Sequence, residues 1–412
     1  MTARYPFSLG AENSQRALWE EELEAIERKG LFRTMPLVAG MPGRSIVVDH
    51  KPALNFSSNN YLGLAGHEKV IEAAIDAARQ IGVGSTASRL IAGNSEIFRR
   101  LEDFIAQWKH TEAALVFGSG YQANVGIISS LVDERDLIVS DELNHASIID
   151  GCRLSRARVA IYRHLDAEDA EQALKRYPAR RKLLVTESVF SMDGDAAPLG
   201  DLSFVCRRRG AMLMVDEAHA TGIRGPHGSG LAAELGVIPE IQMGTLGKAV
   251  GVAGAYVTGE KSLINFLVNT SRSLIYTTAP PPMTAAAALA ALRLIRSPEG
   301  EHRRAQLHEN VIEFHRLLKD RGSLCNSVPA APSHIAPVII GPSDAAMRIS
   351  RECLRNGVFA HGIRYPTVPE GSARLRFTLM SDHTREDLEK AVSVLSDAVA
   401  AITPCKSREC SC

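Results

Sequence analysis

The sequence predicts an α/β protein, in which a large domain with a mostly parallel sheet is joined to a smaller C-terminal α+β domain. Two observations predict this class. Between about residues 96 and 259, apolar strand-like runs alternate with helical runs, which is the pattern of a parallel sheet with helices on both faces. After residue 282, long helical segments precede a second, shorter set of strands. The chain of 412 residues is long enough for two or three domains.

The N-terminal part predicts one helix, then an extended segment and a second helix. Residues 14–29 have helical spacing, and we expect this helix to pack its apolar side on the body of the protein, through Leu18, Leu23 and Ile26. Residues 51–67 move from a short strand into a turn, and residues 68–82 form a helix that ends at Gly82.

The central part predicts the sheet of the large domain. Its strand candidates are residues 113–119, 136–141, 158–164, 182–190, 211–218 and 254–259. Helical patterns fall between most of them, as in 96–108 and 169–177. In such sheets ligands bind at the carboxyl ends of the strands. Three of the predicted strands carry an acidic residue at this end, namely Asp141, Glu187 and Asp216.

The C-terminal part predicts helices at 284–296, 303–320, 345–356 and 384–402, and strands at 334–341, 357–364 and 373–380. Thr384 can cap the last helix, and acidic residues occupy the first turn of this helix. We divide the chain into an N-terminal helix and extended segment (1–60), a large domain (61–295), a small domain (296–402) and a tail (403–412).

Composition excludes some classes of function. Lys plus Arg and Asp plus Glu are both 47, so the formal net charge is zero, which argues against nucleic acid or an anionic membrane as a partner. No run of about 18 apolar residues and no N-terminal signal pattern is present, so we expect no membrane span. Of seven cysteines, three crowd the tail without a second cluster to complete a metal site, namely Cys405, Cys410 and Cys412. We expect a reducing, cytoplasmic location and no metal.

Lys248 is the first candidate for chemistry. It lies among glycines and small residues in GTLGKAVGVAGAY, residues 244–256, which leave open space for a flat partner. A lysine in a dry pocket loses its proton more easily and attacks a carbonyl, as in a Schiff base with pyridoxal phosphate. The alternative is an exposed lysine in a glycine-rich turn, and these residues alone favour it.

Other candidates follow strand ends. Asp216 ends a buried strand, where a carboxylate needs a partner such as a protonated pyridine nitrogen, although it could instead cap the next helix. His145 comes just after a strand, where a structural histidine is the alternative. In FGSGYQANVG, residues 117–126, free backbone N–H groups at a helix start could hold a phosphate, with Gly120 and Tyr121 as the contact points.

Five motifs together carry a resemblance to a family. FGSGYQAN, LNHASIIDG, TESVFSMDGD, MVDEAHATG and TLGKA occur in this order, and the likeness covers about residues 30–402. This set resembles the α-oxoamine synthases, pyridoxal-phosphate enzymes of fold type I. The resemblance implies a large domain with a seven-stranded type of mostly parallel sheet. It also implies a homodimer whose active sites lie at the interface between the subunits.

The resemblance assigns roles around the cofactor ring. Lys248 is similar to the lysine that forms the Schiff base and then removes the α-proton of the amino acid. Asp216 is similar to the partner of the pyridinium nitrogen, which lets the ring accept electrons. His145 resembles the histidine that stacks on the ring and also meets the substrate. His219 and Ser191 resemble the residues at the phenolic oxygen of the cofactor.

It also assigns the phosphate and substrate contacts. Thr245, with the backbone at Gly120 and Tyr121, resembles the phosphate cradle, and Thr277 or Thr278 would add a contact from a second subunit. The expected substrate contacts are Asn59, Arg364, Thr367 and, in a loosely aligned region, Arg33. Among these, Arg364 resembles the arginine that binds the substrate carboxylate by bidentate pairing.

Within this family, the branch of the biotin pathway is the most similar. Its members condense L-alanine with a pimeloyl thioester, carried by CoA or by acyl carrier protein, and give 8-amino-7-oxononanoate, carbon dioxide and free thiol. NFSSNNYLGL and GIRYPTVPEGSARLRFTLMSDHT resemble segments of this branch, with Asn60 where aspartate is usual and Tyr365 where many members carry proline.

Several alternatives stay open. Glycine C-acetyltransferase, 5-aminolevulinate synthase and serine palmitoyltransferase share the central motifs. A second class is a protein that binds pyridoxal phosphate without turnover, which the joint presence of Lys248, Asp216, His145 and His219 disfavours. A third is a dinucleotide-binding oxidoreductase, for which no strand is followed by GxGxxG in the right setting.

Overall fold

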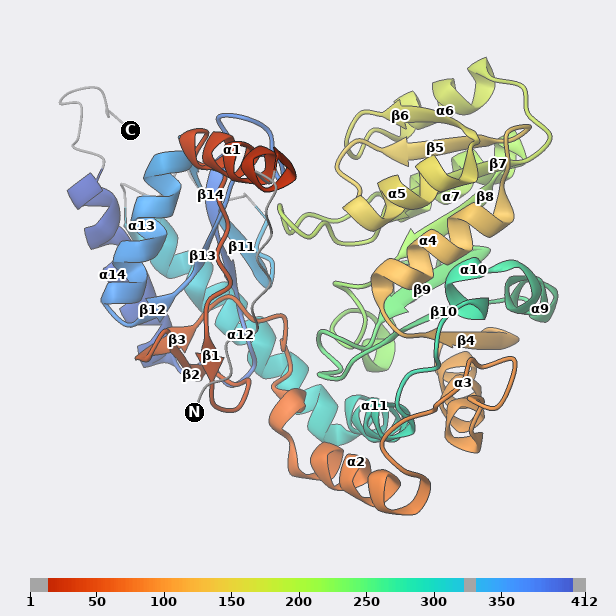
Figure 1. Cartoon of the computed structure of the whole chain (residues 1–412), viewed down its shortest axis with the longest axis horizontal. Helices are drawn as coiled ribbons and strands as arrows, with labels where there is room; N and C mark the ends of the chain where they lie inside the picture. The colour runs from red at the N-terminus through yellow and green to blue at the C-terminus, as the bar shows by residue number, and fades with distance from the viewer. Residues whose placement is uncertain (1–13, 322–330, 403–412) are drawn as a thin grey trace.

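The computed structural model describes residues 14–321 and 331–402. Figure 1 shows two bodies side by side, a large domain around one sheet and a small domain formed by the C-terminal part and the first strands of the chain. The long helix α12 (Pro298–Asp320) runs from one to the other. The expected limits at 61–295 and 296–402 stay an interpretation.

The large domain contains a seven-stranded sheet with the order β4-β10-β9-β8-β7-β5-β6. The strands from β5 to β9 pair in parallel, and only β10 runs antiparallel to its neighbours, β4 and β9. Their bounds are β4 Ala113–Phe117, β5 Leu137–Asp141, β6 Arg158–Tyr162, β7 Lys182–Glu187, β8 Met212–Asp216, β9 Ile241–Thr245 and β10 Ala255–Gly259. The predicted mostly parallel sheet is therefore confirmed.

One strand of this sheet escaped the prediction. All five residues of β9 are buried, yet its sequence IQMGT contains a glutamine and a glycine. These residues break the apolar run by which the other strands were recognised. The strand matters because it leads directly to Lys248.

Helices cover both faces of the sheet. On β5, Leu137 and Val139 belong to one core cluster and Ile138 to the other, as the alternation along a strand requires. One face packs against α4 (Gly120–Leu131), α5 (Ala146–Ser155), α9 (Lys261–Thr270) and α10 (Arg272–Ile275). The other packs against α3 (Glu96–Trp108), α6 (Ala167–Arg176), α7 (Leu199–Arg209) and α11 (Pro282–Ile295).

Short elements complete the large domain. The helix α2 (Glu68–Ile81) packs against the alanine-rich α11. The short helices are η1 (Leu64–Gly66), η2 (Pro226–Gly228) and α8 (Leu231–Glu234). Because alanine side chains of α11 are buried, this segment is a buried helix, as its composition predicts.

The small domain has two sheets. One is antiparallel and contains β11 (Ile335–Gly341), β14 (Ala373–Thr378) and β13 (His361–Ile363). In the other, β12 (Val358–Phe359) pairs with the N-terminal strands, which are β1 (Val38–Ala39), β2 (Ser45–Val48) and β3 (Lys51–Asn55). The N-terminal segment therefore belongs to the fold of the small domain.

Two helices cover these sheets, α13 (Ser343–Arg355) and α14 (Arg385–Ile402). At the start of α14, Thr384 Oγ1 accepts a hydrogen bond from Asp387 N (3.3 Å), and the Asp387 carboxylate accepts one from Thr384 N (3.0 Å). This reciprocal pair is a capping box, so the predicted cap is confirmed.

The first helix, α1 (Ser14–Arg28), corrects an expectation. Its apolar side does not pack on the body of the chain, because Leu18, Leu23 and Ile26 are 56%, 49% and 40% exposed. Within the described residues, this side of the helix is largely uncovered.

The remaining expectations concern cysteines, metals and membranes. Cys152, Cys206 and Cys353 are free and buried. The tail with Cys405, Cys410 and Cys412 lies outside the described residues. Within residues 14–321 and 331–402 there is no group of three or more side chains suited to hold a metal ion. In the same ranges, no helix is both long and apolar enough to span a membrane.

Candidate active site

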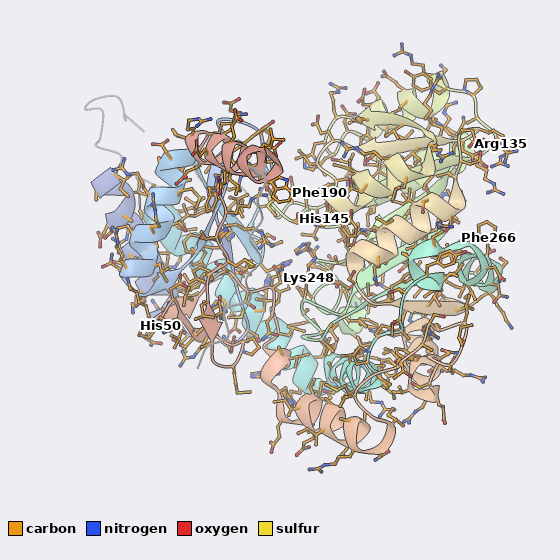
Figure 2. All side chains as sticks on the ribbon, in the orientation of Figure 1. His50, Arg135, His145, Phe190, Lys248 and Phe266 are labelled. Atoms are coloured by element: carbon orange, nitrogen blue, oxygen red, sulfur yellow. The ribbon has the colours of Figure 1, made fainter. Side chains whose placement is uncertain are left out.

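Polar residues at the ends of the parallel strands lie together. Glu187 ends β7 and Asp216 ends β8, and the two are paired in register. The charge of Lys248, three residues beyond β9, acts on Glu187, and both carboxyl groups act on Lys248. Figure 2 shows Lys248 and His145 on the side of the large domain that faces the small domain. The carboxyl ends of the strands therefore form the candidate active site.

Lys248 lies in a tightly packed turn. Gly251, with a φ of 76°, approaches the backbone of Ala65 so closely that a Cβ would lie 2.5 Å from the Ala65 nitrogen. Burial lowers the pKa of Lys248 and Arg376 lowers it further, whereas the nearby carboxylates oppose this change. A lowered pKa increases the fraction of neutral amine, which is the form that attacks a carbonyl.

Asp216 is 4% exposed and lacks a cationic partner at bonding distance among the described residues. Its carboxylate accepts hydrogen bonds from Asn124 Nδ2 (2.8 Å) and from Ala218 N (2.9 Å). A buried carboxylate without a cation is costly, so this environment suits a cationic ring nitrogen. The same amide of Asn124 donates to Ser147 Oγ (2.9 Å), and this contact links Asp216 to α5.

His145 is the N-cap of α5, and its ring is open to solvent. Its Nδ1 accepts a hydrogen bond from Ser147 N (3.2 Å) and lies 2.7 Å from Ser147 Oγ. Because Nδ1 already accepts from Ser147 N, it carries no proton; the proton of the neutral ring is on Nε2, and Ser147 Oγ donates to Nδ1. Partial burial lowers the pKa of His145. The ring is thus held from one edge and free for a flat partner.

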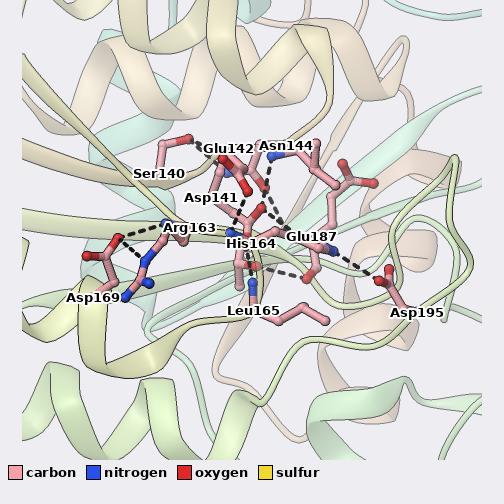
Figure 3. A network of polar contacts seen from close by, with 12 residues as sticks. Ser140, Asp141, Glu142, Asn144, Arg163, His164, Leu165, Asp169, Glu187 and Asp195 are labelled. Atoms are coloured by element: carbon pink, nitrogen blue, oxygen red, sulfur yellow. Dashed lines mark hydrogen bonds and ion pairs between the residues drawn. The ribbon is translucent and has the colours of Figure 1, made fainter. Parts of the chain in front are cut away.

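Glu187 is a second buried carboxyl group in this site. Its Oε1 has no hydrogen-bond partner, and burial with the nearby Asp216 raises the pKa of Glu187 to about 8. Its backbone N–H donates to Asn144 Oδ1 (3.1 Å), and Asn144 Nδ2 donates to Val185 O (2.9 Å). Figure 3 shows this strand-end network. An unpartnered polar atom here indicates room for a polar ligand.

His164 supports the same strand ends from outside. Its Nδ1 lies 2.8 Å from Asp141 Oδ1 and its Nε2 lies 3.0 Å from Asp195 Oδ2, and Figure 3 shows it between them. Burial alone would lower the pKa of His164, but the two carboxylates outweigh it and raise the pKa to about 10. The charged ring therefore ties the end of β5 to the loop after β7.

His219 and Ser191 lie on the loops that follow these strands. His219 is 4% exposed, and its Nδ1 lies 2.7 Å from the hydroxyl of Tyr61. Burial lowers the pKa of His219 far below its ordinary value, with Lys248 and Arg376 acting in the same direction. Ser191 is also buried, and its carbonyl accepts a hydrogen bond from Arg376 Nε (2.5 Å).

The expected phosphate contacts lie around the start of α4. Gly120 is its first residue, and the side chain of the N-cap, Ser119, accepts from Gln122 N (3.2 Å). Thr245 Oγ1 accepts from Gly247 N (3.1 Å) and donates to Gly254 O (3.1 Å). Backbone N–H groups at the start of a helix suit an anion.

Other expected phosphate contacts are less enclosed. Tyr121 is half exposed, and its hydroxyl donates to Asp150 (2.8 Å). Thr278 lines a cavity of about 200 Å³ together with Gly118 and Ser119 of the same chain. Thr277 is exposed. A contact of Thr277 or Thr278 with a second subunit stays a prediction.

Arg376 is the residue that sequence reasoning missed. It lies on β14, is 8% exposed, and has no acidic partner among the described residues. Its Nη1 and Nη2 donate to Asn59 Oδ1 (3.3 Å each), and its charge acts on Lys248 and His219. The alternation in RLRFT gave a signal, because Arg374 and Arg376 share one face of a strand. Arg374 pairs with Asp193, so only Arg376 is free to bind an anion.

The structure does not bring Arg364 together with Lys248. Arg364 and Arg33 line a cavity of about 180 Å³, with His361 and Thr367. Arg364 Nη2 donates to Phe32 O (2.7 Å), and burial and the neighbouring Arg33 lower the pKa of Arg364. Neither arginine has a carboxylate partner in the described part of the chain. The two form a second anion-binding candidate, apart from Lys248.

The residues present fit pyridoxal phosphate. Lys248 offers an amine for its aldehyde, Asp216 offers an unpaired carboxylate for its ring nitrogen, and the free face of His145 matches its flat ring. The orphaned Oε1 of Glu187 and the first turn of α4 provide further polar contacts.

Comparisons with known proteins agree with this fit. The family model for aminotransferase class I and II matches residues 51–395. The 8-amino-7-oxononanoate synthase of Citrifermentans bemidjiense is 47% identical over 378 residues, which cover 91% of this chain and 96% of that protein.

Solved structures are similar as well. The serine palmitoyltransferase of Sphingomonas wittichii matches with a TM-score of 0.87 and 31% identity, covering 95% of this chain and 99% of the other. The 8-amino-7-oxononanoate synthase of Francisella tularensis matches with a TM-score of 0.72 and 28% identity, covering 85% and 98%. The predicted fold type I is thereby confirmed. The chain belongs to the aminotransferase class I and II family and, within it, to the group of the 8-amino-7-oxononanoate synthases.

Proposed function

We propose that the protein condenses L-alanine with a pimeloyl thioester and forms 8-amino-7-oxononanoate, carbon dioxide and free thiol, a step of biotin biosynthesis. The cofactor is pyridoxal phosphate, which supplies an electron sink for the negative charge that develops at the α-carbon of the amino acid. The observation that carries the proposal is the buried, cation-free Asp216 beside Lys248, in a chain 47% identical to synthases of this name.

Lys248 moves the α-proton. Its lowered pKa increases the fraction of neutral amine, the form in which Nζ accepts a proton from the α-carbon and later returns it. Asp216, held by Asn124 and Ala218, would hold a positive charge on the ring nitrogen of the cofactor. His145, at the start of α5, would contact the cofactor ring.

Arg376 and Asn59 bind the carboxylate of L-alanine. Arg376 is nearly buried, has no acidic partner among the described residues, and acts electrostatically on Lys248. A guanidinium binds a carboxylate by two parallel hydrogen bonds, and Asn59 adds a third polar contact. This assignment transfers the role that the sequence suggested for Arg364 to a residue nearer to the catalytic lysine.

The pimeloyl group fits two adjoining cavities. One, of about 280 Å³, is lined mostly by apolar residues such as Ile149, Phe190 and Val368, and also by Glu142 and Asp193. The other, of about 180 Å³, contains Arg33 and Arg364, and Thr367 borders both. An apolar path that ends at two unpaired arginines suits an acyl chain with a terminal carboxylate. An acetyl group would not reach these arginines, and a palmitoyl group would offer them no charge.

The homodimer stays part of this proposal. The uncovered apolar side of α1 supports it, together with the strongly exposed Ile91 and Tyr276. A contiguous exposed apolar patch, such as this side of α1, marks a contact surface. The expected cytoplasmic location and the choice between CoA and acyl carrier protein stay predictions too.

The test is a screen of both substrates. L-Alanine, glycine and L-serine are each combined with pimeloyl-, acetyl-, succinyl- and palmitoyl-CoA, and release of thiol and of carbon dioxide is followed. We expect turnover with L-alanine and pimeloyl-CoA above all other pairs. Preference for glycine, or for an acyl group without a terminal carboxylate, would refute the proposal.

A further inference from the structure

A continuous chain of polar contacts joins Arg376 to His219. Arg376 donates to Asn59 Oδ1 through both terminal nitrogens (3.3 Å each). The hydroxyl of Tyr61 donates to the same oxygen (3.0 Å) and lies 2.7 Å from His219 Nδ1. Tyr61 therefore stands between the carboxylate anchor and a residue at the cofactor.

The centre of this chain is buried. Tyr61 is fully buried and His219 nearly so. The ring of His334 packs edge-on against the ring of Tyr61, with 4.5 Å between the ring centroids. Burial raises the pKa of Tyr61 to about 12, so its hydroxyl keeps its proton. The charged or titratable groups that face His219 are Lys248, Arg376, His334 and His145, and with burial they keep its ring neutral.

The neutral ring of His219 carries one N–H proton. The hydrogen bond with Tyr61 determines which of the two ring nitrogens carries it. Asn59 Oδ1 accepts from Arg376, so the Tyr61 hydroxyl also donates to it. Tyr61 has one proton, so His219 must donate to its oxygen from Nδ1, which leaves Nε2 bare.

A bound carboxylate would reverse this order. When it takes over the N–H groups of Arg376, Asn59 is free to turn its amide and donate from Nδ2 to Tyr61. Tyr61 then donates to His219 Nδ1. His219 loses the Nδ1 proton to water and takes one from water at Nε2, so the ring stays neutral and no proton is gained overall.

We propose that Tyr61 is a positioning residue that couples carboxylate binding at Arg376 and Asn59 to the place of the proton on His219. This inference rests on the proposed function, in which Arg376 holds the carboxylate of L-alanine and His219 meets the phenolic oxygen of the cofactor. Its consequence is that His219 offers an N–H to this oxygen only once the amino acid is in place.

The experiment observes His219 directly in the apoprotein. Protein labelled with ¹⁵N in histidine is compared with and without propionate, which has the carboxylate of L-alanine but no amine. Signals of His219 are assigned by their absence in His219→Asn. We expect the proton on Nδ1 without propionate and on Nε2 at saturation. In Tyr61→Phe we expect the response to propionate to be lost.

Controls separate coupling from folding. Tyr162→Phe removes another buried tyrosine hydroxyl, one at the end of β6 that takes no part in this chain of contacts, and should respond like the parent protein. If Tyr61→Phe does not fold, Asn59→Ala breaks the same chain one step away and should also abolish the response. In the cofactor-loaded protein, propionate should shift the pH titration of the cofactor absorbance, and Tyr61→Phe should lose this shift.

The outcomes are distinguishable. A His219 signal that ignores propionate in the parent protein, or responds unchanged in Tyr61→Phe, overturns the coupling even if L-alanine and pimeloyl-CoA are condensed. Failure of this condensation with the response intact overturns the proposed function and leaves the coupling in place.

Discussion

The buried pair of Lys109 and Glu217 offers a stability prediction that can be worked from the structure. Both side chains are completely buried, and Glu217 follows Asp216 directly in the chain. Lys109 Nζ donates to the Glu217 carboxylate and to Ser229 O, and the carboxylate also accepts from Ala232 N (2.9 Å). The pair therefore stabilises the turn after β8, which carries Asp216 and His219.

Removing one partner should lower the free energy of unfolding strongly. In Lys109→Met, Glu217 keeps only the Ala232 N–H, and an uncompensated buried charge costs about 3–5 kcal/mol. In the double variant Lys109→Met, Glu217→Leu both charges are gone. Ser229 O lacks its donor in both variants, and the further loss in the double variant is the unpaired Ala232 N–H, about 1–3 kcal/mol. The double variant should therefore be more stable than the single one.

The assay is urea unfolding of the apoprotein, followed by circular dichroism and by tryptophan fluorescence to check that the transitions coincide. The reasoning fails if Lys109→Met is as stable as the parent protein. It also fails if the double variant is less stable than Lys109→Met, because removing the unpaired charge of Glu217 would then recover no stability.

Three further predictions test the site. Arg376→Lys should raise the KM for L-alanine roughly 10- to 100-fold, because a charge-assisted hydrogen bond of about 1.5–3 kcal/mol is lost. Arg364→Lys should instead raise the KM for pimeloyl-CoA. Steady-state kinetics that show the reverse pattern would exchange the two roles. Asp216→Asn should lower kcat about 10²–10³-fold while the cofactor still binds, because a preorganised charge is lost, and an unchanged kcat would contradict its role. His164 has a pKa raised from 6.5 to about 10, so its contribution to stability is complete below about pH 6.5 and is lost as the pH rises through about 10; His164→Asn should destabilise the protein in urea at about pH 6 and have little effect near pH 10.5, and a pH-independent loss would argue against the charged ring.

Much of the fold could be read from local pattern. Apolar runs gave six of the seven central strands because both faces of that sheet are buried, and β9 was missed because Gln242 and Gly244 interrupt its apolar run. The packing of α1 could not be predicted, since helical spacing reports an apolar side but not what covers it. The pairing of β12 with β3 joins residues about 300 apart, and no local signal records it.

The site divides in the same way. Lys248, Asp216, His145 and His219 stand in motifs, and the structure brings them together at the strand ends. Arg376 was missed because a strand with two arginines looks like a solvated edge until Asp193 is seen to neutralise only one of them. That distinction depends on contacts nearly 200 residues apart in sequence.

The central claim is that Lys248 carries the cofactor, and reduction tests it most directly. Protein loaded with pyridoxal phosphate is treated with borohydride, digested and analysed by mass spectrometry, with Lys248→Ala as the control. The account predicts a yellow protein that bleaches, with the added mass on the peptide that contains Lys248 and no added mass in Lys248→Ala. A colourless protein that takes up no cofactor, or an added mass on another lysine, would contradict it.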